Sequence, residues 1–422
     1  MKINAARTAD GVRFDLAPND EDVAYCENRK GKLSGRSVTL KCGTLHPDIQ
    51  ALLGLLIAAP FTAKSFELDR GVSPAFAEAV AANLKRKIEP IDDAVTPRQP
   101  GGRDALAFSG GVDSVAALAV MPKETVAVFL HRVSDVETKS MYRADAALRS
   151  CEAVRATGRE MIVADTDLEH VRTPVGFPID WSNAAPAVAL ADELGLRSVS
   201  FGMIAESAFH LGHHHYSDLA SRAIYRSWAP VFDAVGVSIS LPTAGVSEVV
   251  TSRIAAAYPE MLAQSCVRGT GDTPCGRCFK CFRKTLLDAA VTGRKVAPSH
   301  FDNLNPEVVR RLGERPIHHE AVLAYSIHRM PPVDHPLYRA LFDLTRPLAD
   351  AYGLDYLDRL YTRGLDYVHA SHRDEVARNL SRFAAPMSLS EAQGLADWSL
   401  DGILAEAPYQ TAGQKVQALL EA

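Results

Sequence analysis

The sequence predicts an α/β protein whose core is a doubly wound parallel sheet. From Asp104 onward, short apolar runs alternate with helical segments, which is typical of a parallel sheet covered on both faces. Residues before this core mix strand and helix patterns, and residues after about 296 are helical in pattern to the end. We therefore expect four parts, which are a small α+β module (1–88), a linker (89–103), the core domain (104–295) and a helical C-terminal domain (296–422).

Composition excludes several classes of protein. The 422 residues are 47% hydrophobic and 23% charged, which is ordinary for a soluble globular protein. The net charge of −5 gives no general basic field for nucleic acid. No apolar run approaches the ~20 residues of a membrane span, and the N-terminus lacks an apolar signal segment, so we predict a cytoplasmic protein without membrane contact. Seven cysteines, an odd number, favour thiols or metal ligands over disulfides.

In the N-terminal module, two runs alternate apolar and polar residues, and two segments have apolar residues at helical spacing. The runs predict strands over 12–16 and 37–42, and the segments predict helices over 48–58 and 73–87. Three prolines and two glycines without periodicity then predict the linker.

The core domain alternates strand and helix. Strands are expected over 105–108, 125–130, 160–164 and 197–202, and helices over 115–120, 138–157, 184–194 and 246–257. Ligands of such sheets bind at the carboxyl ends of the strands.

One glycine-rich loop stands at such an end. Ser109-Gly110-Gly111-Val112-Asp113-Ser114 follows the first core strand and opens the first core helix. Adjacent glycines let the backbone turn its N–H groups outward, and a helix N-terminus adds partial positive charge, so the segment predicts a phosphate site. The hydroxyls of Ser109 and Ser114 add donors, and Asp113 is a candidate ligand for Mg²⁺. An ordinary strand-to-helix turn is the alternative interpretation.

No lysine follows the glycines, so the loop differs from the common GxxxxGK[ST] pattern. SGGVDS instead resembles the PP-loop of the ATP pyrophosphatase superfamily, whose members cut ATP between the α and β phosphates. The resemblance implies that residues 109–114 bind ATP, with Ser109, Asp113 and Ser114 also catalytic. By analogy with this fold, we expect the adenine near the end of the second strand, beside Phe129, Leu130 and His131, with Arg132 near the phosphates.

Four cysteines form the pattern C-x8-C-x2-C-x2-C at Cys266, Cys275, Cys278 and Cys281. Four thiolates suit a tetrahedral, closed and therefore structural Zn²⁺ site. An iron–sulfur cluster and a redox Cys-x-x-Cys pair are the alternatives.

The loop and the cysteines together resemble the 7-cyano-7-deazaguanine synthase family, over about residues 104 to 292. Gly202 and Glu206 stand where that family has G-x-N-x-E-D, and Ser265 to Gly269 is similar to its S-C-Y-x-G. The resemblance implies an ATP- and Mg²⁺-dependent C–N ligase that adenylates a carboxylate, a 7-deazaguanine or related small molecule, and lets ammonia form an amide or nitrile. This chain keeps only Asn183 of the family's P-G-R-N loop, and it lacks the lysine of the T-K-x-E helix start.

Substrate contacts are therefore expected at Asn183 and Glu206, with Glu206 touching substrate or Mg²⁺; a solvated carboxylate at a helix start is the alternative for Glu206. We interpret the histidine-rich segment 210–218 as a substrate-binding or solvent-exposed loop, and we prefer this interpretation to a metal site. Basic residues around the cysteines, such as Lys280 and Arg283, form either a solvated surface or an approach to an anionic substrate.

Two other functions remain open at this point. The first is a sulfur transferase acting on RNA, which needs a reactive Cys151 or an iron–sulfur cluster. The second is a nucleotide-binding relic that serves as a partner-binding module. The flanking regions leave room for a homodimer contact or a protein partner.

Overall fold

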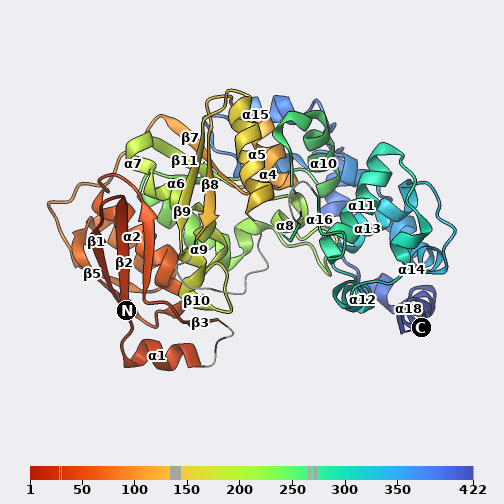
Figure 1. Ribbon diagram of the computed structural model, residues 1–422, viewed down its shortest axis with the longest axis horizontal. Helices are drawn as coiled ribbons and strands as arrows, with labels where there is room; N and C mark the ends of the chain where they lie inside the picture. Colours follow the sequence, from red (N-terminus) through yellow and green to blue (C-terminus); the bar gives the residue numbers. More distant parts are fainter. Residues whose placement is uncertain are drawn as a thin grey trace.

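The centre of this computed structural model is a large, mostly parallel sheet. The structure describes residues 1–27, 29, 31–133, 144–264, 266, 268–269 and 273–421. In this part of the chain the sheet has ten strands in the order β12-β11-β7-β8-β9-β4-β2-β1-β5-β6 (Figure 1). Its strands are β1 (Lys2–Arg7), β2 (Gly11–Ala17), β4 (Ser37–Lys41), β5 (Ser65–Val72), β6 (Lys87–Ile91), β7 (Arg103–Phe108), β8 (Val126–Arg132), β9 (Met161–Thr166), β11 (Leu196–Ser200) and β12 (Ser238–Ser240). Two short strands, β3 (Lys32–Leu33) and β10 (Arg172–Thr173), pair separately.

Helices pack on both faces of the sheet and form the C-terminal region. The helices of the first part of the chain are α1 (Asp20–Glu27), α2 (Pro47–Ala58), α3 (Pro74–Leu84), α4 (Val112–Val120), α5 (Asp145–Ala156), α6 (Ala185–Ala189), α7 (Ala191–Leu194), α8 (Ala205–Ala208), α9 (Ala223–Ala234) and α10 (Glu248–Ala257). The later helices are α11 (Phe279–Thr292), α12 (Pro306–Gly313), α13 (Glu320–Arg329), α14 (Pro336–Tyr352), α15 (Arg373–Leu380), α16 (Leu389–Ala396), α17 (Asp401–Ala405) and α18 (Ala407–Glu421).

The core strands follow a topology that creates a binding crevice. β7 pairs in parallel with β8 and with β11, β8 pairs with β9, and β11 pairs with β12. The chain therefore moves outward from β7 through β8 to β9, returns, and continues on the other side of β7. Such a reversal of strand order leaves a crevice at the carboxyl ends of the two strands beside it, here β7 and β11. The predicted α/β class with a parallel core sheet is confirmed.

Both faces of the core sheet are buried, which explains the continuous apolar runs. Along β8, Val126, Val128 and Leu130 point into one core, whereas Ala127 and Phe129 point into the other. The first core also holds side chains of α2, α6 and α9, and the second holds those of α4, α10 and α15. A strand buried on both faces needs apolar residues at every position.

The N-terminal strands extend the same sheet. β4 pairs antiparallel with β9 through Leu40 and Thr166, so residues 1–91 continue the core sheet at its β9 edge. The apolar pattern does not predict β5, because its central residues Glu67, Asp69 and Arg70 are polar and exposed. Hydrogen bonds to β1 and β6, together with buried side chains at Phe66 and Val72, define that strand.

Three predicted helices differ in detail from the observed ones. The predicted helix 73–87 ends at Leu84, because the chain turns there and β6 begins at Lys87, so the first residues of the predicted linker belong to a strand. The predicted helix 184–194 is divided into α6 and α7 at Leu190, whose backbone (φ −95°, ψ 5°) leaves the helical region. The predicted helix 138–157 corresponds to α5 from Asp145, and its expected first residues lie in 134–143, outside the described residues.

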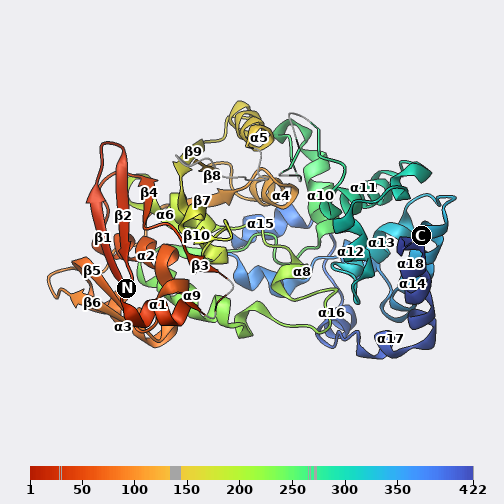
Figure 2. The same ribbon diagram turned by 60° about the horizontal axis from the view of Figure 1, so that its bottom comes forward.

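The C-terminal region is helical, as its pattern predicts. α14 packs against α18, and α11 packs against α13, in a group of helices at the end of the molecule remote from β1 (Figures 1 and 2). α15 instead returns to the core sheet, where the Asn379 amide donates to the Val120 carbonyl (2.9 Å) beside α4. None of the described helices is long and apolar enough to cross a membrane.

Candidate functional site

The glycine-rich loop lies at the crevice between β7 and β11. β7 ends at Phe108 and α4 begins at Val112. Gly110 has φ +74°, a left-handed conformation that glycine adopts without strain. The Ser109 N–H donates to Ser114 Oγ (2.9 Å), and the Gly111 N–H points at Ser109 Oγ (3.4 Å). The two serines thus hold the loop closed around the start of α4.

The N-terminus of α4 is left open, unlike those of α10 and α11. Its N-cap residue, Gly111, provides no side-chain acceptor for the first-turn N–H groups. In contrast, Ser247 caps α10, and Cys278 accepts the Cys281 N–H at the start of α11. Uncapped N–H groups at a helix start suit an anion such as a phosphate.

Gly202, which follows β11 after one intervening residue, lets the loop helix approach the sheet closely. A Cβ atom at this position would lie 2.8 Å from the Asp113 carbonyl carbon and oxygen and 2.9 Å from the Ser114 nitrogen. Only a residue without a side chain fits such contacts with backbone atoms. The glycine therefore sets the distance between the end of β11 and the loop.

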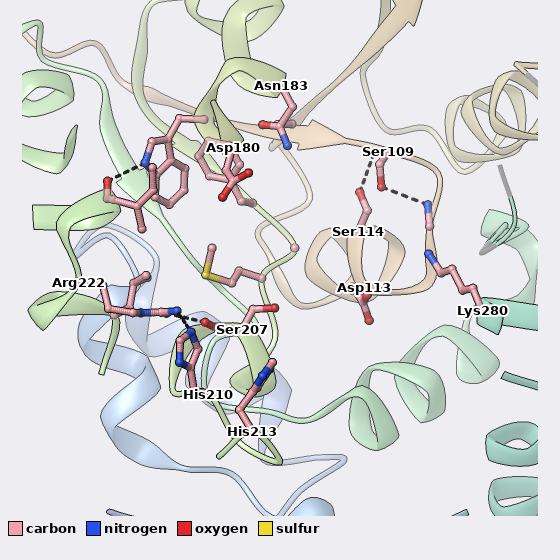
Figure 3. Close-up of a pocket in the computed structure, with 18 residues that line it drawn as sticks. Ser109, Asp113, Ser114, Asp180, Asn183, Ser207, His210, His213, Arg222 and Lys280 are labelled. Carbon is pink, nitrogen blue, oxygen red and sulfur yellow. Dashed lines mark hydrogen bonds between the residues drawn. The ribbon is translucent and has the colours of Figure 1, made fainter. Parts of the chain in front are cut away.

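A cavity of about 510 Å³, here cavity 1, opens over the loop. Figure 3 shows Ser109, Asp113, Ser114 and Lys280 on one side of it and Arg222, His210 and His213 on the opposite side. Asp180 and Asn183 complete a third wall. Asn183, which the sequence predicts to contact the substrate, thus lines the same cavity as the loop. Its Oδ1 atom is buried and has no donor among the described residues.

Asp113 is oriented by a neighbouring helix. Thr251 of α10 donates its hydroxyl to Asp113 Oδ1 (2.7 Å). The carboxylate lines cavity 1 beside the loop N–H groups. A carboxylate oxygen beside N–H groups that suit an anion has the chemistry that Mg²⁺ prefers, so these residues are compatible with a magnesium nucleotide.

Arg222 and two histidines form the wall opposite the loop. The Arg222 guanidinium contacts His210 Nε2 and donates to the Ala208 carbonyl (2.9 Å). Burial, and next the charge of Arg222, lower the pKa of His210 to about 4, and the same causes lower the pKa of His213. Both imidazoles are therefore neutral at pH 7, and the charge on this wall belongs to Arg222. His214 and His215 are exposed and face Asp401, as expected for a solvent-facing part of that segment.

The residues expected around the adenine do not line cavity 1. Phe129 and Leu130 are buried in the two cores. His131 Nδ1 lies 2.8 Å from Asp165 Oδ1, and Arg132 forms an ion pair with Glu169. The structure thus places these four residues at the end of β8, next to β9 and outside the lining of cavity 1.

Glu206 is fully buried and lines neither cavity 1 nor the surface. Its carboxyl oxygens accept the Glu248 N–H (2.9 and 3.2 Å) at the start of α10. Burial, followed by the nearby Glu248 charge, raises the pKa of Glu206 to about 8. Glu248 itself is paired with Arg283 and Lys284 of α11. The solvated carboxylate considered from the sequence is wrong, because the side chain lies between α8 and α10 in the protein interior.

The four predicted metal ligands come together. One ligand atom from each of Cys266, Cys275, Cys278 and Cys281 lies within 4.8 Å of the others. Cys275 Sγ and Cys281 Sγ are 3.7 Å apart. Zn–S bonds of about 2.3 Å in a tetrahedron place the sulfur atoms about 3.8 Å apart, so the cluster can hold a metal ion and is compatible with zinc. Ser265 and Val267, which flank the first cysteine, lie outside the described residues.

Lys280 is the site residue that the loop pattern could not reveal. It stands between Cys278 and Cys281, and the cysteine cluster brings it to cavity 1 beside the loop. The sequence places it only in a basic segment about 170 residues after the loop. Arg222 and Asp180 likewise carry no local signal, because each reaches the cavity from a separate connection between core elements.

A family model matches the second half of the chain in part. Residues 227–399 match a family of unknown function, DUF6395. No curated protein and no solved structure matches the chain. The matched segment begins within α9, includes the cysteine cluster and ends beyond α16, so the glycine-rich loop lies outside it.

Proposed function

We propose that this protein is an ATP-dependent C–N ligase that forms AMP and pyrophosphate while it activates a carboxylate for reaction with ammonia. The observation that carries the proposal is the loop at the crevice between β7 and β11, where an uncapped helix N-terminus and Asp113 face one cavity. This arrangement supports a PP-loop assignment and binding of a magnesium nucleotide.

The chemistry follows from the placement of charge in cavity 1. An oxygen of the substrate carboxylate attacks the α-phosphorus, and the bond to pyrophosphate breaks. The loop N–H groups and Lys280 stabilise the negative charge of the departing pyrophosphate. Ammonia then displaces AMP from the acyl adenylate to form an amide, which a second activation can convert to a nitrile.

The third wall of cavity 1, which contains Asn183, supports a small, nitrogen-rich acid as the acceptor. Asn183 offers a buried acceptor atom that needs an N–H donor, and Trp181 and Phe201 add aromatic surface to the same cavity. A carboxylic acid of the 7-deazaguanine kind has ring N–H groups and an apolar face, so it satisfies both features.

Sulfur transfer is less well supported. The Cys151 side chain is only 1% exposed, and burial raises the pKa of its thiol to about 12. A nucleophilic sulfur needs an accessible thiolate, which this position does not provide at neutral pH. The spacing of the four clustered cysteines also suits a single ion.

The decisive experiment incubates the protein with ATP, Mg²⁺, ammonium and a library of small carboxylic acids, and follows products by mass spectrometry. We expect acid-dependent release of AMP and pyrophosphate that is lost in Asp113→Ala. Asp93→Ala, which alters an exposed carboxylate between β6 and β7, serves as the matched control and retains activity. ATP binding without turnover for any acid would refute the ligase and favour a nucleotide-binding module.

A further inference from the structure

A second cavity, cavity 2, adjoins the loop on the side of the C-terminal region. Its volume is about 370 Å³, and it shares Asp113, Gly202, Ser207 and Lys280 with cavity 1. Its remaining polar wall comes from α10 and α11 and from residues beyond 300, which are Glu307, Arg311, His318 and His319. The two cavities therefore meet at the loop, and the second exists only because the C-terminal helices pack there.

Several hydrogen-bond donors of cavity 2 have no acceptor. The Arg283 side chain is 6% exposed, and its Nε atom is buried without a partner among the described residues. His319 Nδ1 is likewise buried and unpartnered in the described part of the chain. Lys280 makes no ion pair with any residue that the structure describes. Lys280 is exposed, whereas the nitrogen atoms of Arg283 and His319 are buried, and a buried polar atom without a partner destabilises the protein until a ligand pairs with it.

The acidic residues of cavity 2 are already paired. Glu248 has two cationic partners, Arg283 and Lys284 (2.7 Å to the latter). Glu307 is paired with Arg268. Only Asp113, which belongs to the loop, lacks a cationic partner among the described residues of this wall. The net charge beside the loop is therefore positive, because Lys280 has no acidic partner among the described residues and Glu248 has two cationic partners.

We propose that cavity 2 binds an oxyanion of the acceptor substrate, so that the acceptor is an acid with a second anionic group besides the carboxylate activated at the loop. Arg283, His319 and Arg311 are the residues that contact this group, and Arg311 also has Glu314 as a partner. Lys280 lines both cavities and stays with the pyrophosphate. The inference rests on the proposed function, because that function identifies the ligand as the acceptor substrate. The second anionic group is a carboxylate or a phosphate, because the oxygen atoms of both accept several charge-assisted hydrogen bonds.

Calorimetry on the full, zinc-bound chain without ATP tests the assignment. The probes are glutarate and adipate against the monoacids butyrate and hexanoate, with 3-phosphonopropionate as the phosphonate acid. Inorganic phosphate and pyrophosphate are titrated separately as free anions. We expect at least one acid with two anionic groups to bind at least about tenfold more tightly than its monoacid, the effect of one charge-assisted hydrogen bond.

Two variants locate the effect. Arg311→Gln should abolish the advantage of the second anionic group. Arg310→Gln is the matched control, because Arg310 precedes it on α12 and shares its partner Glu314 but does not line cavity 2. His319→Leu should act like Arg311→Gln, and unchanged melting temperatures would show that the variants fold.

Three outcomes would overturn the proposal. The two-anion acids could bind no better than monoacids, Arg311→Gln could keep the full advantage, or only free phosphate and pyrophosphate could bind in an Arg311-dependent way. Failure of the proposed function has a different signature, since acid-dependent AMP release would be absent while the binding difference between Arg311→Gln and Arg310→Gln persisted.

Discussion

Replacing Gly202 by alanine should separate the loop helix from the end of β11. The new Cβ would lie 2.8 Å from two atoms of the Asp113 carbonyl group, so α4 and β11 must move apart by about 0.6 Å to reach an ordinary contact of 3.4 Å. Both partners are backbone, so rotation of a side chain offers no relief. Overpacking of this kind costs about 1–3 kcal/mol in the free energy of unfolding.

The same displacement should weaken nucleotide binding more than it weakens the fold. Asp113 and Ser114 line cavity 1, and a shift of this size would lengthen the hydrogen bonds from the N–H groups at the start of α4 to the proposed phosphate beyond the useful range. Loss of one charge-assisted hydrogen bond corresponds to about 1.5–3 kcal/mol, so the dissociation constant for magnesium ATP should rise by at least about tenfold.

Urea denaturation and equilibrium binding of ATP provide the measurements. Gly394→Ala is the control, because a Cβ there meets no atom within 4 Å and the residue lies inside α16. That variant should gain about 0.5–1 kcal/mol from the higher helix propensity of alanine and bind ATP like the wild type. If Gly202→Ala retained both its stability and its ATP affinity, the close approach would not position the loop.

Three further predictions concern the cysteine cluster and the buried charges. Cys275→Ser should lose bound zinc on dialysis, as measured by plasma mass spectrometry, whereas Cys42→Ser should retain it; zinc retained by the first variant would contradict the assigned ligands. Arg283→Met should lower the free energy of unfolding by about 3 kcal/mol, because it removes one partner of the buried Glu248, while Arg277→Met at an exposed position should change it by less than ~0.5 kcal/mol. Finally, the folded protein keeps a proton on Glu206, whose pKa is raised to about 8, and the unfolded chain releases it near the ordinary 4.5. Stability should therefore fall as the pH rises from about 5 through 8, and denaturation curves of Glu206→Gln should show a weaker decline, whereas an unchanged pH dependence would mean that Glu206 is ionised in the folded state.

The secondary structure of the core was largely predictable, because its signals are local. The apolar runs at β7, β8 and β9 and the Ser247 cap of α10 identify these elements without knowledge of the fold. β5 was not predictable, since its central residues are polar and its hydrogen bonds join it to β1 and β6, which lie elsewhere in the chain. β1 was not predicted either, although most of its hydrogen bonds go to the neighbouring strand β2. The pairing of β4 with β9, which joins the N-terminal strands to the core sheet, is equally non-local.

The sequence by itself determined the glycine-rich loop and the four-cysteine cluster. In both, the chemistry depends on residue types at short spacing, within 109–114 and 266–281, so the pattern alone carries the information. Only the tertiary structure decided which charges meet the loop. Lys280, Arg222 and the residues of cavity 2 come from connections and helices distant in sequence, and Glu206 is buried because the start of α10 packs against α8, which carries it. Their positions follow from the packing of whole helices, a property of the folded chain that no single stretch of it contains.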